Sequence, residues 1–159
     1  MESKREKIIV LGFGNEILTD DGIGVRIVKK IQNEEIFSSM SFDVGWLGGM
    51  EILDFIENYD TAVFIDAIRT KDGSPGDVYH FTPGDFLETL HLSNVHDTSF
   101  ENTIKMGRKL GMVIPDTIHV LAVEIVEDLV FSKSFSPKVE KKYPEILDYI
   151  RRFLSSLIK

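Results

Sequence analysis

The chain has 159 residues, a length typical of one domain, and it contains no cysteine. It therefore forms no disulfide, no thiolate metal site and no cysteine-protease nucleophile. Its 26 acidic residues outnumber 18 basic ones, and the net charge of −8 argues against nucleic acid or an anionic membrane surface as a partner. Because no signal peptide or membrane-length apolar run is seen, we expect one cytoplasmic domain over residues 1–159.

The first part of the chain alternates strand and helix patterns. Lys7–Gly12 is a short, β-branched apolar run ended by glycine, typical of a buried strand. After a polar loop, the apolar residues of Gly22–Gln32 recur on one helical face, and Thr19 or Asp20 could cap that helix. The next expected elements are a short strand at Ser41–Val44, a glycine-rich loop at Gly45–Gly49 and a helix at Met50–Asn58.

The second part continues the alternation. Further strands are expected at Thr61–Ala67, Asp77–Phe81 and Thr117–Val123, and helices at Asp97–Leu110 and Pro144–Ile158, with one short helix within Thr82–Ser93. This order predicts an α/β fold, a three-layer αβα sandwich with a twisted sheet of about five mostly parallel strands.

Ligands of such sheets bind beyond the carboxyl ends of the strands, and reactive side chains gather there in this sequence. They are Glu16, Asp20, Asp21, Asp66, His96, Glu124, Glu127 and Asp128. Two carboxylates and an imidazole could hold a divalent metal such as nickel, zinc, manganese or non-haem iron. The spacing alone is weak evidence, because the donors come from separate loops.

Each of these side chains also has an ordinary structural interpretation. Asp20 and Asp21 precede a helix, where acids cap free amides, and Asp66 could bond loop amides. Glu16 could be solvated surface, and His96 an ordinary loop histidine. The other histidines, at positions 80, 91 and 119, are expected to be structural.

Several common motifs are missing. Ile17 replaces the third glycine of a dinucleotide fingerprint, and the chain has neither a P-loop nor a G-x-S-x-G elbow.

A receiver-like signalling module that binds metal and accepts phosphate on Asp66 is an alternative. However, the acidic pair Asp20–Asp21 lies well beyond the strand end, and the last strand ends in HVLAVEIVED, with no lysine to meet a phosphoryl group.

The opening IIVLGFGNEILTDDGIGVRIVKKI resembles the hydrogenase maturation proteases, whose signature is a strand followed by G-x-G-N-x-[IL]-x-x-D-[DE]-x-[IVL]-G. The resemblance continues through DVGWLGGMEIL, FIDAI, SNVHDTSF, HVLAVEIVED and FSPKV. It implies an endopeptidase that removes a C-terminal peptide from the nickel-loaded precursor of a nickel–iron hydrogenase large subunit. A relative that binds the precursor without cleaving it is a further alternative.

The resemblance also implies the site residues. The metal ligands are expected to be Glu16, Asp66 and His96, and the catalytic carboxylates Asp43, Glu16 and Asp66, with Asp43 as a candidate general base. Nickel would arrive within the substrate, and other divalent metals could substitute for it. The partner is the large-subunit precursor, and the protein is expected to be a monomer or weak homo-oligomer.

Overall fold

The computed structural model describes residues 3–45, 49–84, 89–92 and 99–158. A five-stranded sheet forms the middle layer, in the order β2-β1-β3-β5-β4. The strands are β1 (Ile8–Phe13), β2 (Ser41–Gly45), β3 (Thr61–Ile68), β4 (Val78–Phe81) and β5 (Thr117–Glu124). All neighbours are parallel except β4, which runs antiparallel to β5. The predicted mostly parallel sheet is confirmed.

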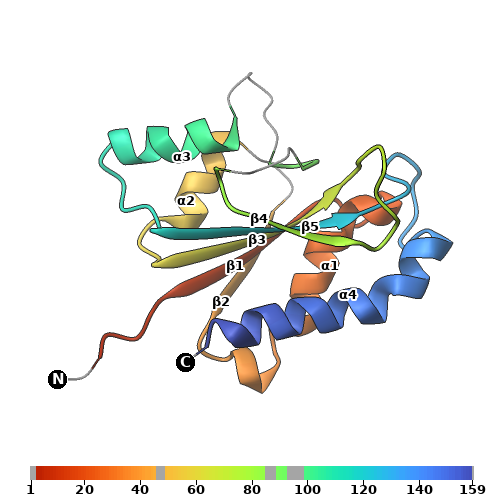
Figure 1. The fold of residues 1–159 in the computed structure, drawn as a ribbon, viewed down its shortest axis with the longest axis horizontal. Helices are drawn as coiled ribbons and strands as arrows, with labels where there is room; N and C mark the ends of the chain where they lie inside the picture. Colours follow the sequence, from red (N-terminus) through yellow and green to blue (C-terminus); the bar gives the residue numbers. More distant parts are fainter. Residues whose placement is uncertain (1–2, 46–48, 85–88, 93–98, 159) are drawn as a thin grey trace.

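Helices cover both faces of the sheet (Figure 1). One face carries α1 (Ile23–Ile31) and α4 (Pro137–Ser156), and the other carries α2 (Ile52–Ile56) and α3 (Phe100–Lys109). Short 3₁₀ turns lie at Thr19–Gly22, Glu35–Phe37 and Gly49–Glu51. The three-layer αβα prediction is therefore confirmed, while a single domain over the whole chain stays a prediction.

The strands divide their side chains between two apolar cores. Along β1, Ile8 and Val10 pack on the α1–α4 side, whereas Ile9 and Leu11 pack on the α2–α3 side. All six residues of β1 are buried, which explains why its sequence is a continuous apolar run. Helix α1 lies unusually close to the sheet, since a Cβ at Gly24 would be 2.1 Å from the carbonyl oxygen of Ile65.

Two element boundaries differ from the expectation. Helix α4 begins at Pro137 and contains Pro144, where we expected it to begin. A proline inside a helix loses one backbone hydrogen bond, but the buried face of α4 extends to both sides of Pro144, through Val139 and Ile146, and keeps the helix continuous. The described part of Thr82–Ser93 contains no helix, and residues 85–88 and 93 lie outside it.

Helix α3 begins at Phe100, with the Ser99 hydroxyl accepting a hydrogen bond from the Asn102 amide at 3.2 Å. Residues 97 and 98, which we expected to open this helix, lie outside the described residues. None of the helices in the described part of the chain combines the length and apolar character needed to cross a membrane.

Candidate functional site

Asp66 lies near the carboxyl end of β3 with its side chain fully buried. Its carboxylate accepts four hydrogen bonds. Oδ1 accepts from the Ala67 amide (2.8 Å) and from His91 Nδ1 (2.6 Å), and Oδ2 accepts from the Thr89 hydroxyl (2.7 Å) and the His91 amide (2.7 Å). A buried carboxylate needs such partners, because burying an unpaired charge is very costly.

His91 joins Asp66 to a second carboxylate. Its other ring nitrogen, Nε2, lies 3.1 Å from Oδ1 of Asp21, and Oδ2 of Asp21 accepts the Asn15 amide at 2.7 Å. We call Asp21, His91 and Asp66 the carboxylate cluster. No sequence pattern indicated His91 as a member of this site. What positions it is a backbone hydrogen bond at 2.9 Å from the Leu90 amide to the carbonyl of Ala67, next to Asp66.

The two carboxylates determine the charge of His91. Burial by itself lowers the pKa of the imidazole, but the hydrogen bonds to Asp21 and Asp66 and the charges of both groups together raise it to about 10. At neutral pH the ring is therefore an imidazolium that bridges two acids. The cluster is an acid–base–acid arrangement at the carboxyl ends of the strands, where ligands of this fold class bind.

This charge predicts a pH dependence of stability. The pKa of His91 is about 10 in the folded chain and near 6.5 in the unfolded chain, so the stabilisation is complete below pH 6.5 and is lost as the pH rises through 10. Between these values the wild type should lose up to about 1.4 kcal/mol of unfolding free energy per pH unit relative to His91→Gln. Urea unfolding of both proteins at several pH values, in chelator, measures this. A constant difference would contradict the assigned charge.

The first loop, which carries Asp21, adopts strained backbone conformations. Gly14 has a φ of 137°, and a Cβ there would lie 2.1 Å from the carbonyl oxygen of Asp21, so only glycine fits. Thr19 has a left-handed φ of 53°, which a β-branched residue rarely adopts. Its amide bonds the carbonyl of Ser132 (3.0 Å), and its hydroxyl bonds that of Val130 (2.6 Å). The loop is therefore held by the segment after β5.

Asp20 strengthens the same connection. Its fully buried carboxylate accepts the amides of Val126 (3.1 Å), Glu127 (3.0 Å) and Ser136 (2.8 Å), and the Ser136 hydroxyl (2.7 Å). The expectation that Thr19 or Asp20 caps α1 is wrong, because the residue at the cap position is Gly22 and no side chain bonds there. Instead, the acid organises the loop between β5 and α4 by accepting three of its backbone amides.

Glu16 lies apart from the carboxylate cluster. Its side chain is 40% exposed and forms an ion pair with Lys29 of α1. Within the described residues, no hydrogen bond or ion pair joins Glu16 to Asp21, Asp66 or His91. It borders instead a hollow of about 290 Å³, lined also by apolar Ile17, Val25 and Val44 (with Gly14, Asn15 and Gly45). The structure thus unites Asp66 with Asp21 and not with Glu16.

Asp43 is exposed on β2, and its Oδ1 accepts the amide of the next residue at 2.8 Å. Asp43 pairs with Leu11 of β1, and Leu11 pairs with Phe64 of β3. Asp43 therefore lies on the same face of the sheet as Asp66, which is two residues further along and two strands away. Strand geometry puts the two Cα atoms about 12 Å apart. His96 lies outside the described residues.

The remaining acids of the predicted crevice are bound elsewhere. The carboxylate of Glu124 accepts the amide (3.0 Å) and hydroxyl (2.8 Å) of Thr70, and Asp128 pairs with Arg69 at 2.7 Å. Across the described ranges, no group of three or more metal-ligating side chains is open to a metal ion. In the cluster the reason is plain, since the imidazolium of His91 occupies the space between the carboxylates.

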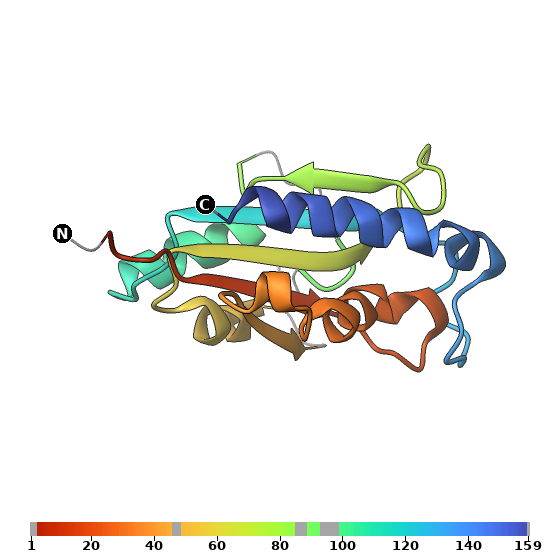
Figure 2. The ribbon, with the colours of Figure 1, turned by 90° about the horizontal axis from the view of Figure 1, so that it is seen from below.

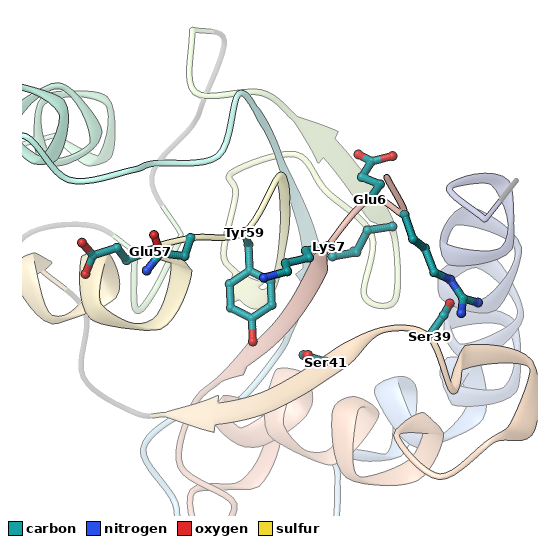
Figure 3. A pocket seen from close by; sticks show the side chains of 9 residues that line it. Glu6, Lys7, Ser39, Ser41, Glu57 and Tyr59 are labelled. Carbon is teal, nitrogen blue, oxygen red and sulfur yellow. The ribbon is translucent and has the colours of Figure 1, made fainter. Parts of the chain in front are cut away.

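A second hollow, of about 580 Å³, lies at the amino ends of the strands (Figure 3). Side chains of both charges line it, among them Glu6, Lys7 and Glu57, together with Ser41 and Tyr59. None of the predicted site residues contributes to its walls. The chemistry of the chain is therefore concentrated at the opposite end.

Known proteins of similar sequence identify the family of this chain. The sequence pattern of the family described as hydrogenase maturation protease matches residues 25–152. The chain belongs to the hydrogenase maturation protease family. The predicted family is therefore confirmed, and the predicted enzyme class, a hydrolase of peptide bonds, agrees with it.

Individual relatives support the assignment. A hydrogenase 2 maturation protease of Escherichia coli is 41% identical over 71 residues, which are 44% of this chain and 43% of the relative. A hydrogenase expression/formation protein, HupD, of Thiocapsa roseopersicina is 27% identical over 94% of this chain and 68% of its own length. The structure of the hydrogenase maturating endopeptidase HybD of E. coli is similar with a TM-score of 0.72 and 26% identity, over 94% of this chain and 93% of that one.

The family signature includes Asp21, although the predicted metal ligand in this loop is Glu16. Aligned on Gly12 and Gly14, the pattern places Asp20 at its invariant aspartate and Asp21 at the [DE] position. Glu16 falls on an unspecified position. The signature therefore marks Asp20 and Asp21, and of these two acids only Asp21 contacts His91.

Proposed function

We propose that this chain is an endopeptidase that removes a C-terminal peptide from the nickel-loaded precursor of a nickel–iron hydrogenase large subunit. Family membership and the names of the similar proteins support the substrate. The observation that carries the proposal is the pair of buried carboxylates, Asp21 and Asp66, held on either side of His91 at the carboxyl ends of the sheet.

In this proposal Asp21 and Asp66 contact the nickel ion that the precursor carries, and Asp21 takes the place first assigned to Glu16. Carboxylate and imidazole donors suit nickel and other divalent metals. Because His91 now satisfies both acids, it must turn aside, or itself bind the metal, when the substrate enters. His96 stays a predicted ligand. Cleavage then depends on nickel, because a precursor without nickel has no metal cation to replace the imidazolium of His91 between the two carboxylates.

Peptide hydrolysis also needs a base that takes a proton from the attacking water. Asp43 is exposed on the sheet face that carries Asp66, and an extended peptide lying across the strand ends would pass between the two acids. We therefore keep Asp43 as the proposed base. The partly apolar hollow beside Glu16 and Ile17 is a place for a substrate side chain next to the cleaved bond.

A rigid apolar loop next to the site suits a folded partner. Leu129, Val130 and Phe131 are 77%, 58% and 77% exposed, yet Asp20 and Thr19 hold their loop in place. The loop contacts the first loop through the pairing of Leu18 with Ser132, and both lie at the same end of the sheet (Figure 2). Exposed apolar patches of this kind mark interaction sites, so we assign the contact with the body of the precursor to this loop.

Phe131→Ser should therefore raise KM for the folded precursor by roughly 10-fold and leave kcat nearly unchanged, as loss of a binding anchor does. Steady-state cleavage at several precursor concentrations measures both constants. Leu110→Ser is the matched control, because Leu110 is 64% exposed at the end of α3, away from this loop. If both variants had the same KM, the loop would not be part of the interface with the precursor.

The function itself is tested by incubating the protein with the large-subunit precursor of its own source, nickel-loaded and nickel-free, and measuring intact mass. The proposal predicts loss of a C-terminal peptide from the loaded form alone. Tight binding without trimming would instead show a non-catalytic relative. The receiver-like alternative loses support, because the chain belongs to the hydrogenase maturation protease family. Cytoplasmic location and oligomeric state stay predictions.

A further inference from the structure

Two histidines meet on the opposite face of the sheet from Asp66. His80 of β4 is paired with Leu121 of β5, and His119 stands two residues before Leu121 on the same strand face. Nε2 of His80 lies 2.9 Å from Nδ1 of His119. The Phe153 ring of α4 packs edge-on against both imidazoles, with centroids 4.9 and 5.1 Å away. We name these two residues the histidine pair.

We propose that the histidine pair binds a divalent late transition metal, Ni²⁺ or Cu²⁺. Imidazole is a common ligand of both ions. A cation about 2.05 Å from each of two nitrogens that are 2.9 Å apart makes an N–metal–N angle of about 90°. That is the angle between neighbouring ligands in square-planar and octahedral geometry. A tetrahedral ion such as Zn²⁺ would need the nitrogens about 3.3 Å apart, so the spacing favours nickel and copper.

A metal ion can replace the hydrogen bond between the two rings. In the hydrogen bond between the rings, one nitrogen donates its proton and the other accepts with a free lone pair. For a metal to bind, the ring that donates the proton only has to shift to its other tautomer, with the proton on its far nitrogen. When both rings are neutral, no proton is released. His80 is exposed, so a small turn of its ring that keeps this spacing of the two nitrogens brings both lone pairs to one ion, while water completes the coordination.

The pair is independent of the proposed protease site. It shares no residue with the carboxylate cluster, and it joins β4, the antiparallel edge strand, to β5. A metal held by both strands stabilises the folded chain only, since the unfolded chain does not bring His80 and His119 together. The site therefore adds a metal-dependent stabilisation of the sheet edge. If no metal binds to the histidine pair, the cleavage proposal is unaffected.

The test uses the full chain without an affinity tag. Wild type, His80→Gln, His119→Gln and, as a control, Asp148→Asn, an exposed residue of α4, are titrated with Ni²⁺ while the melting temperature is followed. We expect Ni²⁺ at about 100 times its Kd to raise Tm by roughly 5 °C in wild type and in Asp148→Asn. Either histidine substitution should abolish the rise. A rise of equal size in His80→Gln would overturn the proposal.

A second measurement counts the nitrogen ligands directly. The electron paramagnetic resonance spectrum of one equivalent of Cu²⁺ bound to wild type should show coupling to two imidazole nitrogens, falling to one in either variant. The chain has only four histidines, so the assignment is simple. An unchanged spectrum in both variants would contradict the site even if those variants were less stable.

Discussion

Replacing Asp21 by Asn should lower the rate of precursor cleavage by about 100-fold or more, because it removes one of the two carboxylates that meet at His91. Glu16→Gln should leave the rate within about 3-fold of wild type, since it breaks only an exposed ion pair with Lys29. The assay is cleavage of the nickel-loaded precursor, followed by mass spectrometry. Asn keeps the size of Asp and can still accept the Asn15 amide, so the fold should survive.

This pair of variants discriminates between two acids of one loop. Circular dichroism and melting temperature serve as the control that both variants are folded. If Glu16→Gln were the inactive variant and Asp21→Asn the active one, the proposal of Asp21 as nickel contact would fail, and the original prediction of Glu16 would be restored. Equal losses would assign the metal contact to both acids.

The largest effect on stability is expected at Asp20. Asp20→Ala removes the acceptor of three backbone amides and one hydroxyl, all from the loop between β5 and α4. Leaving buried donors without partners is costly, so we expect the free energy of unfolding to fall by about 3–5 kcal/mol. Urea denaturation measured by fluorescence or circular dichroism gives this difference, provided that the slope with urea is unchanged.

Asp148→Ala is the matched control for Asp20. Asp148 is also an aspartate, but it forms an ion pair with Arg152 and its side chain is 62% exposed on α4. Its removal should cost less than about 0.5 kcal/mol, as expected of a surface pair one helical turn apart. A loss below about 1 kcal/mol for Asp20→Ala would show that the amides find water instead, and that the loop is less ordered than its hydrogen bonds indicate.

The layers of the fold could be predicted because the strands are buried on both sides. In β1 and β3 every residue is buried, and such strands appear in a sequence as continuous apolar runs. The start of α4 could not be placed in this way, because Pro144 normally marks a helix boundary. Only the tertiary contacts of the buried residues before and after it show that the helix runs through.

Asp66 could be predicted as a site residue from its place at a strand end, but its partners could not. His91 lies in the segment Thr82–Ser93, where the pattern indicated only one short helix, and a backbone hydrogen bond from Leu90 to Ala67 brings it to Asp66. The role of Asp20 depends on contacts more than a hundred residues away in the chain, with Val126 and Ser136. No local pattern reports contacts of that kind.

Glu16 is a predicted site residue that the structure does not bring to Asp66. A glutamate in the first loop matched the chemistry expected of a metal ligand, while Asp21 had an ordinary interpretation as an acid before a helix. In the structure Glu16 reaches outward to Lys29, and Asp21 turns inward to His91. The direction in which each acid points depends on the backbone of the loop, whose unusual φ values at Gly14 and Thr19 are not visible in composition or spacing.

The most direct test is the position of nickel in crystals of the protein bound to its nickel-loaded precursor, located by anomalous scattering at the nickel absorption edge. We expect a peak about 2.1 Å from carboxylate oxygens of both Asp21 and Asp66, with the His91 ring displaced or itself coordinating. A nickel peak on Glu16, or an Asp21–His91–Asp66 cluster left undisturbed beside the bound nickel, would contradict the proposal.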